Sequence, residues 1–169
     1  MPAPVHSSRS ERNSIVKSTL EMVKIDLAPT HKQPPAALIL VATAVSLVGS
    51  LAVDALLVAI GTRILRSTAG YVHFRFSDYA KLTTIGVIIA CAAWPIVTRI
   101  SSNPRWVFVR MAVLVTLVLL LPDLYLLIKG QPIKAVAVLV AMHLAIGLVT
   151  YNALVHLAPI RRRRVGATR

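Results

Sequence analysis

The chain has 169 residues, of which 56% are hydrophobic and only 15% are charged, and its mean hydropathy is +0.72. A soluble domain of ordinary composition carries about 25% charged residues, so this composition excludes a typical soluble globular protein. The formal net charge is +13, but the basic residues lie between and outside the apolar runs, which favours anionic lipid headgroups over nucleic acid as their partner. We therefore predict an all-α polytopic membrane protein with no nucleic-acid partner.

Residues 1–35 form a polar tail without an apolar run near its start, so we expect the first membrane-spanning helix to act as the targeting signal. Ser8 and Glu11 have the spacing of a capping box. Four apolar residues of the tail recur at helical spacing, Val16, Leu20, Val23 and Leu27. Two readings stay open: an amphipathic helix in the membrane interface, or a partly ordered tail that binds nothing.

Four apolar runs are long enough to cross a bilayer, which takes about 20 residues of helix. We predict spans over residues 36–60, 80–98, 107–128 and 133–156. Short connections make neighbouring spans antiparallel, so these residues should form a four-helix transmembrane bundle. The polar tail of residues 1–35 precedes this domain, and a basic tail of residues 157–169 follows it.

The first predicted span has one small, polar face. The residues of that face lie at intervals of four and are Ala42, Ser46, Ser50 and Asp54, with Gly49 beside them. Small residues let two helix backbones approach closely in a membrane, so we expect this face to contact other helices while Leu and Val residues face lipid.

The second predicted span holds the only cysteine, Cys91, which excludes an internal disulfide and is expected to be a small buried hydrophobe. Ser77 or Asp78 is positioned to cap the start of this helix. Trp94 lies near its far end, where we expect it to mark the membrane interface.

The third predicted span has a single charged residue over residues 111–128, Asp123, which follows Pro122. Because proline cannot donate a backbone hydrogen bond, we expect a kink beside the acid. A charge at the bilayer centre costs roughly 2.5 to 3.5 kcal/mol on insertion scales, so Asp123 should face other helices and not lipid.

Asp54, Asp123 and His143 are the candidate residues of a polar site inside the membrane. A tight turn over residues 129–132 makes the last two spans neighbours, so Asp123 and His143 should face the bundle interior on adjoining helices. Counted from that turn, they differ in depth by about 7 Å at 1.5 Å per residue. We therefore expect a water molecule or Tyr125 between them.

Two readings of these three residues stay open. In the functional reading, they form a proton- or cation-sensitive site that opens to the outer face and binds a basic or hydroxylated ligand. In the structural reading, the acids only satisfy buried hydrogen bonds or pair near the surface with Arg75, Lys81 or Tyr125.

The sequence lacks the residues that several kinds of chemistry require. A paired-histidine haem cytochrome requires axial histidines on facing helices, whereas only the fourth predicted span holds any. His143 and His156 lie 13 residues apart on that span, which is the wrong spacing for a shared metal site. Walker, HExxH and GxSxG motifs are absent from the sequence. We predict no enzyme activity, no metal and no cofactor.

The basic residues are distributed unevenly between the two sides of the predicted bundle. With the basic residues at the adjoining span ends included (Arg110, Lys81 and Lys134), the two tails and the loop between the second and third spans hold 13 Lys and Arg residues, whereas the other two loops hold 6. The positive-inside rule then predicts a multi-pass protein of the plasma membrane with both termini in the cytoplasm. The run Arg161, Arg162, Arg163 and Arg164 should bind anionic headgroups, at about 1 kcal/mol per residue.

Two apolar phrases carry a resemblance to a known family. They are LLLPDLYLL over residues 119–127 and AMHLAIGLV over residues 141–149, after a short second span that ends in a basic loop. Together they resemble a family of small actinobacterial four-span membrane proteins known only as a domain of unknown function. The resemblance implies the four-helix fold and supports grouping Asp123 with His143; it implies no activity and leaves out the N-terminal tail.

From the sequence we expect a non-enzymatic accessory or interaction subunit of a cell-envelope membrane complex, with another membrane protein or a second copy as partner. The alternative is a small proton-coupled transporter that uses Asp54, Asp123 and His143. Asp54 keeps this alternative open, although the first span lacks the aromatic lining that a lipophilic-cation site needs.

Overall fold

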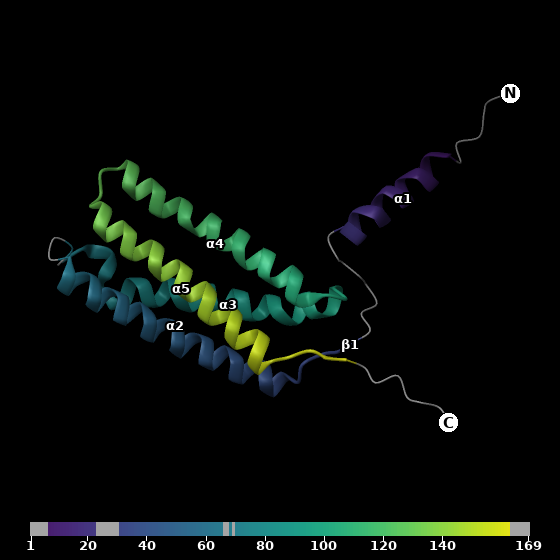
Figure 1. Ribbon diagram of the computed structural model, residues 1–169, viewed down its shortest axis with the longest axis horizontal. Helices are drawn as coiled ribbons and strands as arrows, with labels where there is room; N and C mark the ends of the chain where they lie inside the picture. The colour runs from purple at the N-terminus through teal and green to yellow at the C-terminus, as the bar shows by residue number, and fades with distance from the viewer. Residues whose placement is uncertain (1–6, 23–30, 66–67, 69, 163–169) are drawn as a thin grey trace.

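Four long helices dominate the computed structural model of the protein, which describes residues 7–22, 31–65, 68 and 70–162 (Figure 1). They are α2 (Ala36–Ile64), α3 (Phe76–Ile100), α4 (Pro104–Ile128) and α5 (Ile133–Leu157). The shorter elements are helix α1 (Ser7–Met22), the 3-10 helix η2 (Val72–Phe74) and the two-residue strands β1 (His31–Lys32) and β2 (Arg161–Arg162).

Each of the four long helices is long and apolar enough to cross a membrane. They run in alternating directions and pack side by side, whereas α1 projects away from them (Figure 1). The predicted all-α polytopic bundle is therefore confirmed. We refer to the end where α2 begins and α5 ends as the tail end, and to the opposite end, at residues 70–75 and 128–133, as the loop end.

All four long helices extend beyond the predicted spans, α5 by a single residue. Helix α2 continues through Gly61 to Ile64, α3 begins at Phe76 instead of residue 80, and α4 begins at Pro104 instead of residue 107. Proline fits the first turn of α4 because the N–H groups of a first turn have no acceptor within the helix, so its missing N–H costs no hydrogen bond. The predicted cap of α3 was wrong: its N-cap is Arg75 without a side-chain hydrogen bond, and the Ser77 hydroxyl donates to Asp78 instead.

The turn between α4 and α5 is tight, as predicted. Gly130 has φ +77°, a left-handed conformation that glycine adopts without strain, and its N–H donates to the Leu127 carbonyl at 3.0 Å. Pro132 is the N-cap of α5. Helix α4 itself continues through Pro122 as one element. This tight turn makes α4 and α5 antiparallel neighbours.

The small face of α2 packs closely against α5, as predicted. Ala42, Ser46, Ser50 and Asp54 are all fully buried. A Cβ atom on Gly49 would lie 3.1 Å from Val149, and one on Gly61 would lie 2.9 Å from Val138. Glycine at these two positions therefore permits a backbone separation that larger residues would prevent. On the outward side of α2, large apolar residues such as Leu40 and Val48 are 70% and 69% exposed.

The apolar core lies toward the tail end and is centred on Trp94, which is fully buried. The prediction that Trp94 marks the membrane interface was wrong, because its ring packs edge-on against Phe108 at 4.9 Å and its indole N–H donates to the Ala158 carbonyl at 3.0 Å. Phe108 in turn stacks on Tyr151 at 6.0 Å. Cys91 is buried in the same core, as predicted.

Both tails meet at the tail end. Strands β1 and β2 pair antiparallel, with His31 opposite Arg162 and Lys32 opposite Arg161. Thr98, which is fully buried near the end of α3, accepts a hydrogen bond on its carbonyl from the Gln33 amide at 2.9 Å. The His31 ring lies 2.6 Å from that carbonyl. The two tails are thus joined to each other and to α3.

Part of the tail preceding this junction forms helix α1, and its apolar side chains are exposed, with Val16 at 55%. The side chains of Ser8 and Glu11 and the residues Val23 and Leu27 lie outside what the structure describes. The predicted capping box and the full apolar stripe therefore stay predictions.

Candidate functional site

Asp54, Asp123 and His143 all lie in the half of the bundle nearer the loop end, on α2, α4 and α5. Asp123 is 3% exposed and Asp54 is fully buried, while the side chain of His143 is 26% exposed. The prediction that Asp123 and His143 face the interior on adjoining helices is confirmed. Lipid-facing positions of α4, such as Leu121 at 59%, are far more exposed than Asp123.

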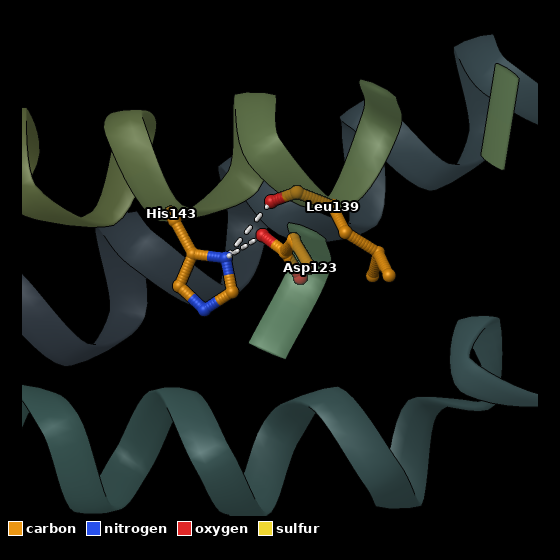
Figure 2. Close-up of polar contacts among 3 residues, drawn as sticks. All are labelled: Asp123, Leu139 and His143. Carbon is orange, nitrogen blue, oxygen red and sulfur yellow. Dashed lines mark hydrogen bonds and ion pairs between the residues drawn. The ribbon is translucent and has the colours of Figure 1, made fainter. Parts of the chain in front are cut away.

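Asp123 and His143 make direct contact. Figure 2 shows two oxygens on the same side of the imidazole Nδ1 of His143: Asp123 Oδ2 at 2.9 Å and the Leu139 carbonyl at 3.1 Å. Because a carbonyl can only accept, the proton sits on Nδ1 and is directed at Leu139. Asp123 Oδ2 makes no well-directed hydrogen bond within the described residues. The acid therefore lies at ion-pair distance from the ring without a well-directed hydrogen bond to it.

The direct contact replaces the expected bridge through water or Tyr125. Side chains on a helix lean toward its N-terminus. Asp123 on α4 therefore leans toward the tail end, and His143 on the antiparallel α5 leans toward the loop end. The two side chains thus lean toward each other and meet, although their Cα atoms lie at different depths. Tyr125 is 58% exposed, with the Lys129 ammonium 5.4 Å from its ring centre.

Asp54 has a different environment. Its Oδ2 accepts a hydrogen bond of 2.6 Å from the Thr83 hydroxyl of α3, whereas its Oδ1 is buried and has no hydrogen-bond partner among the residues that the structure describes. His143 is near enough to influence Asp54 electrostatically, but no direct contact joins the two side chains within the described residues. We refer to Asp54, Asp123 and His143, which lie in the same half of the bundle, as the polar cluster.

Sequence reasoning missed three hydroxyl residues that lie beside these acids. They are Thr83 and Tyr79 of α3, and Tyr71 of the connection between α2 and α3. Tyr79 and Thr83 lie four residues apart on the buried face of α3 together with Val87 and Cys91. That spacing was the available signal, because a polar pair in register with buried apolar residues indicates an inward-facing position.

Tyr71 extends the cluster to the loop end. Its Oη is buried without a hydrogen-bond partner in the described part of the chain. Burial and the nearby Asp123 carboxylate raise the pKa of the Tyr71 phenol above its ordinary value. The phenol therefore stays protonated and presents a neutral O–H near the acid.

The other predicted partners lie elsewhere. Arg75 and Lys81 are exposed, and no ion pair joins either to Asp54 or Asp123 within the described residues. In the same part of the chain, no three His, Cys, Asp or Glu side chains are grouped closely enough to hold a metal ion. Arg161 and Arg162 lie in the strand pair at the tail end, while Arg163 and Arg164 are outside the described residues.

The part of the chain that contains this cluster, from β1 to the end of α5, coincides with a known sequence family. A family model described as a family of unknown function (DUF6069) matches residues 30–159. The chain belongs to the DUF6069 family. The match includes Asp54, Asp123 and His143 and excludes α1. Neither curated proteins nor solved structures match the chain. The actinobacterial character of the family stays a prediction.

Proposed function

We propose that this integral membrane protein is a small proton-coupled transporter of the plasma membrane and is not an enzyme. The observation that carries the proposal is the contact of Asp123 with His143 in the same half of the bundle as the fully buried Asp54, whose Oδ1 has no hydrogen-bond partner in the described part of the chain. Ionisable groups inside a membrane domain are expensive to bury and commonly mark ion or proton pathways.

The partly paired oxygens favour this function over a purely structural role. A structural cluster should satisfy its members, since a buried polar atom without a partner costs about 1 to 3 kcal/mol. Asp54 Oδ1 and Tyr71 Oη are buried without hydrogen bonds in the described part of the protein, and Asp123 Oδ2 lies against the His143 ring without a well-directed hydrogen bond. The open bonding position on Asp54 suits a site that takes up and releases a proton or a cation.

The test is proton movement in vesicles that contain the purified full-length protein and a pH-sensitive dye. A panel of alkali cations and organic amines is added outside, and at least one is expected to drive proton movement. Asp54→Asn and Asp123→Asn should each reduce it to the level of empty vesicles, because an amide keeps the shape of the acid but cannot exchange a proton.

Asp78→Asn is the matched control, since Asp78 lies in the first turn of α3 and outside the cluster. This variant should retain the wild-type rate. Proton movement that persists in both cluster variants, or that no substrate elicits in the folded wild type, would contradict the transport function.

A second candidate is an accessory or interaction subunit of a cell-envelope complex. Helix α1 favours it, because its apolar residues Ile15, Val16 and Met22 are 63%, 55% and 77% exposed. Another membrane protein that covers α1 should be recovered with the full-length chain from native membranes and lost when residues 1–30 are deleted. An identical set of recovered proteins from both forms would leave this role without support.

For topology, we propose that both tails are cytoplasmic, where the basic residues of the tails contact anionic headgroups. The pairing of β1 with β2 supports a common side for the two tails. A reporter fused after Arg164, or inserted within residues 101–104, should be active in the cytoplasm. Periplasmic activity from either position would reverse the orientation.

A further inference from the structure

The buried acids differ in how their charge is balanced. Asp123 lies 2.9 Å from His143, so a carboxylate and an imidazolium can form a pair of zero net charge. Asp54 is hydrogen-bonded to a neutral hydroxyl, that of Thr83. No ion pair joins Asp54 to a basic side chain in the part of the chain that the structure describes. Asp54 is therefore the acid whose charge is not balanced by direct contact.

Side chains of α3 and α5 lie near Asp54. Thr83 and Tyr79 approach from α3, and His143 acts on it electrostatically from α5. His143 is in contact with Asp123. A fully buried carboxylate in this setting can be neutralised either by a proton on its own oxygen or by a bound monovalent cation.

Two unpartnered oxygens lie about one helix turn apart on the buried face of α2. Asp54 Oδ1 and Ser50 Oγ are both fully buried, and neither has a hydrogen-bond partner within the described residues. Ser50 precedes Asp54 by four residues, so their side chains are neighbours on the same face of α2. Ser46, one turn further along, is equally buried, but its hydroxyl already donates to the Ala42 carbonyl at 2.7 Å.

We propose that Asp54 and Ser50 form an exchange site at which one alkali cation, such as Na⁺, replaces one proton. This inference rests on the proposed transport function and names its substrate class. In one state the Asp54 carboxyl is protonated and neutral. In the other, the O–H bond of the acid breaks, the proton leaves to solvent, and the carboxylate Oδ1 and the Ser50 hydroxyl oxygen coordinate the cation. Net charge is the same in both states.

The ligand chemistry selects this class of cation. Oxygen ligands suit hard cations, whereas thiolate and imidazole ligands select softer transition metals. A divalent ion would leave one positive charge uncompensated, because Asp54 supplies a single negative charge and Asp123 is paired with His143. Thr83, which contacts Asp54, and Ser50 on the same helix face supply hydroxyl oxygens, which offer no selective contact to the apolar part of a lipophilic amine.

The exchange is measured as proton release from the full-length protein in detergent, in weakly buffered solution with a pH indicator. Adding NaCl, KCl or LiCl should release close to one proton per chain for at least one cation, whereas choline chloride should release none. Asp54→Asn should abolish the release. Because that variant can fail to fold, circular dichroism is recorded for each protein and a second variant is included.

Ser50→Ala is that second variant, with Ser46→Ala as its matched control. Loss of the Ser50 oxygen should raise the cation concentration for half-maximal release by about tenfold, the effect of one interaction with a charged group. The number of protons released should not change. Ser46→Ala should leave the concentration unchanged, because the Ser46 hydroxyl is engaged with its own helix.

Each result decides the proposal. Proton release that no alkali cation elicits from the folded wild type, release that persists in folded Asp54→Asn, or equal effects of the two serine variants would overturn the site. The vesicle assay separates this from the function itself. Release in detergent without proton movement in vesicles keeps the site and removes transport, whereas movement driven only by organic amines keeps transport and removes the alkali site.

Discussion

Asp123→Leu is expected to destabilise the bundle by about 1 to 3 kcal/mol. The substitution removes the acid that lies 2.9 Å from His143 and leaves the buried face of the imidazole against an apolar side chain. The free energy of unfolding is measured by titrating the protein from mild detergent into a denaturing one and following helix content by circular dichroism.

Two control variants are compared with Asp123→Leu. Asp123→Asn keeps an oxygen near the imidazole and should be destabilising by less than Asp123→Leu. Leu121→Ala, at a position of the same helix that is 59% exposed, should be close to neutral. If Asp123→Leu proves as stable as wild type, the contact with His143 contributes nothing to the packing of α4 on α5.

Trp94→Ala is expected to lower the free energy of unfolding by about 3 kcal/mol, because it leaves a cavity at the centre of the core at the tail end. Trp94 is fully buried, packs against Phe108 and donates its indole N–H to the Ala158 carbonyl, just beyond the end of α5. The substitution thus removes both an aromatic contact and a hydrogen bond. The same detergent titration measures the loss.

Trp94→Phe separates these two contributions. It keeps an aromatic ring and leaves the Ala158 carbonyl without its donor, so it should cost about 1 kcal/mol. Trp106→Phe is the comparison, since Trp106 is only partly buried and contacts the Arg110 guanidinium at 3.6 Å. Losses that are equal for Trp94→Ala and Trp106→Phe would show that Trp94 does not hold the core together.

The sequence predicts the four helices well because each apolar run has only one stable state in a bilayer, with all backbone groups bonded inside the helix. The small face of α2 was also predictable, since Ser46, Ser50 and Asp54 recur at intervals of four. Helix ends were less predictable. Gly61 and Arg63 look like loop residues, yet α2 includes both, because Gly61 lets α2 pack closely against Val138.

The grouping of Asp123 with His143 could be predicted, but their direct contact could not. Counting residues along the helix axis gives the depth of each Cα atom, and it ignores the opposite lean of side chains on antiparallel helices. The position of Trp94 was missed for a related reason. Its distance from the helix end indicated depth in the membrane, whereas its direction depended on α4 and α5, which pack over it.

Tertiary pairing of short polar segments could not be predicted. His31 and Lys32 meet Arg161 and Arg162 in β1 and β2, although all four residues are basic and no alternating pattern marks either strand. The backbone bonds of this pair form because the ends of α2 and α5 bring the two segments together. The local sequences of β1 and β2 do not indicate that the two segments lie together.

The pairing of β1 with β2 places the two ends of the membrane domain side by side. Paired strands lie about 5 Å apart, so a short linker between residues 31 and 162 can join the two ends of the domain. A circular permutant opened at the Gly130 turn should then keep all four helices and present its new termini at the loop end. Two copies fused head to tail would also share one orientation in the membrane, since an even number of crossings returns each copy to the side from which it started.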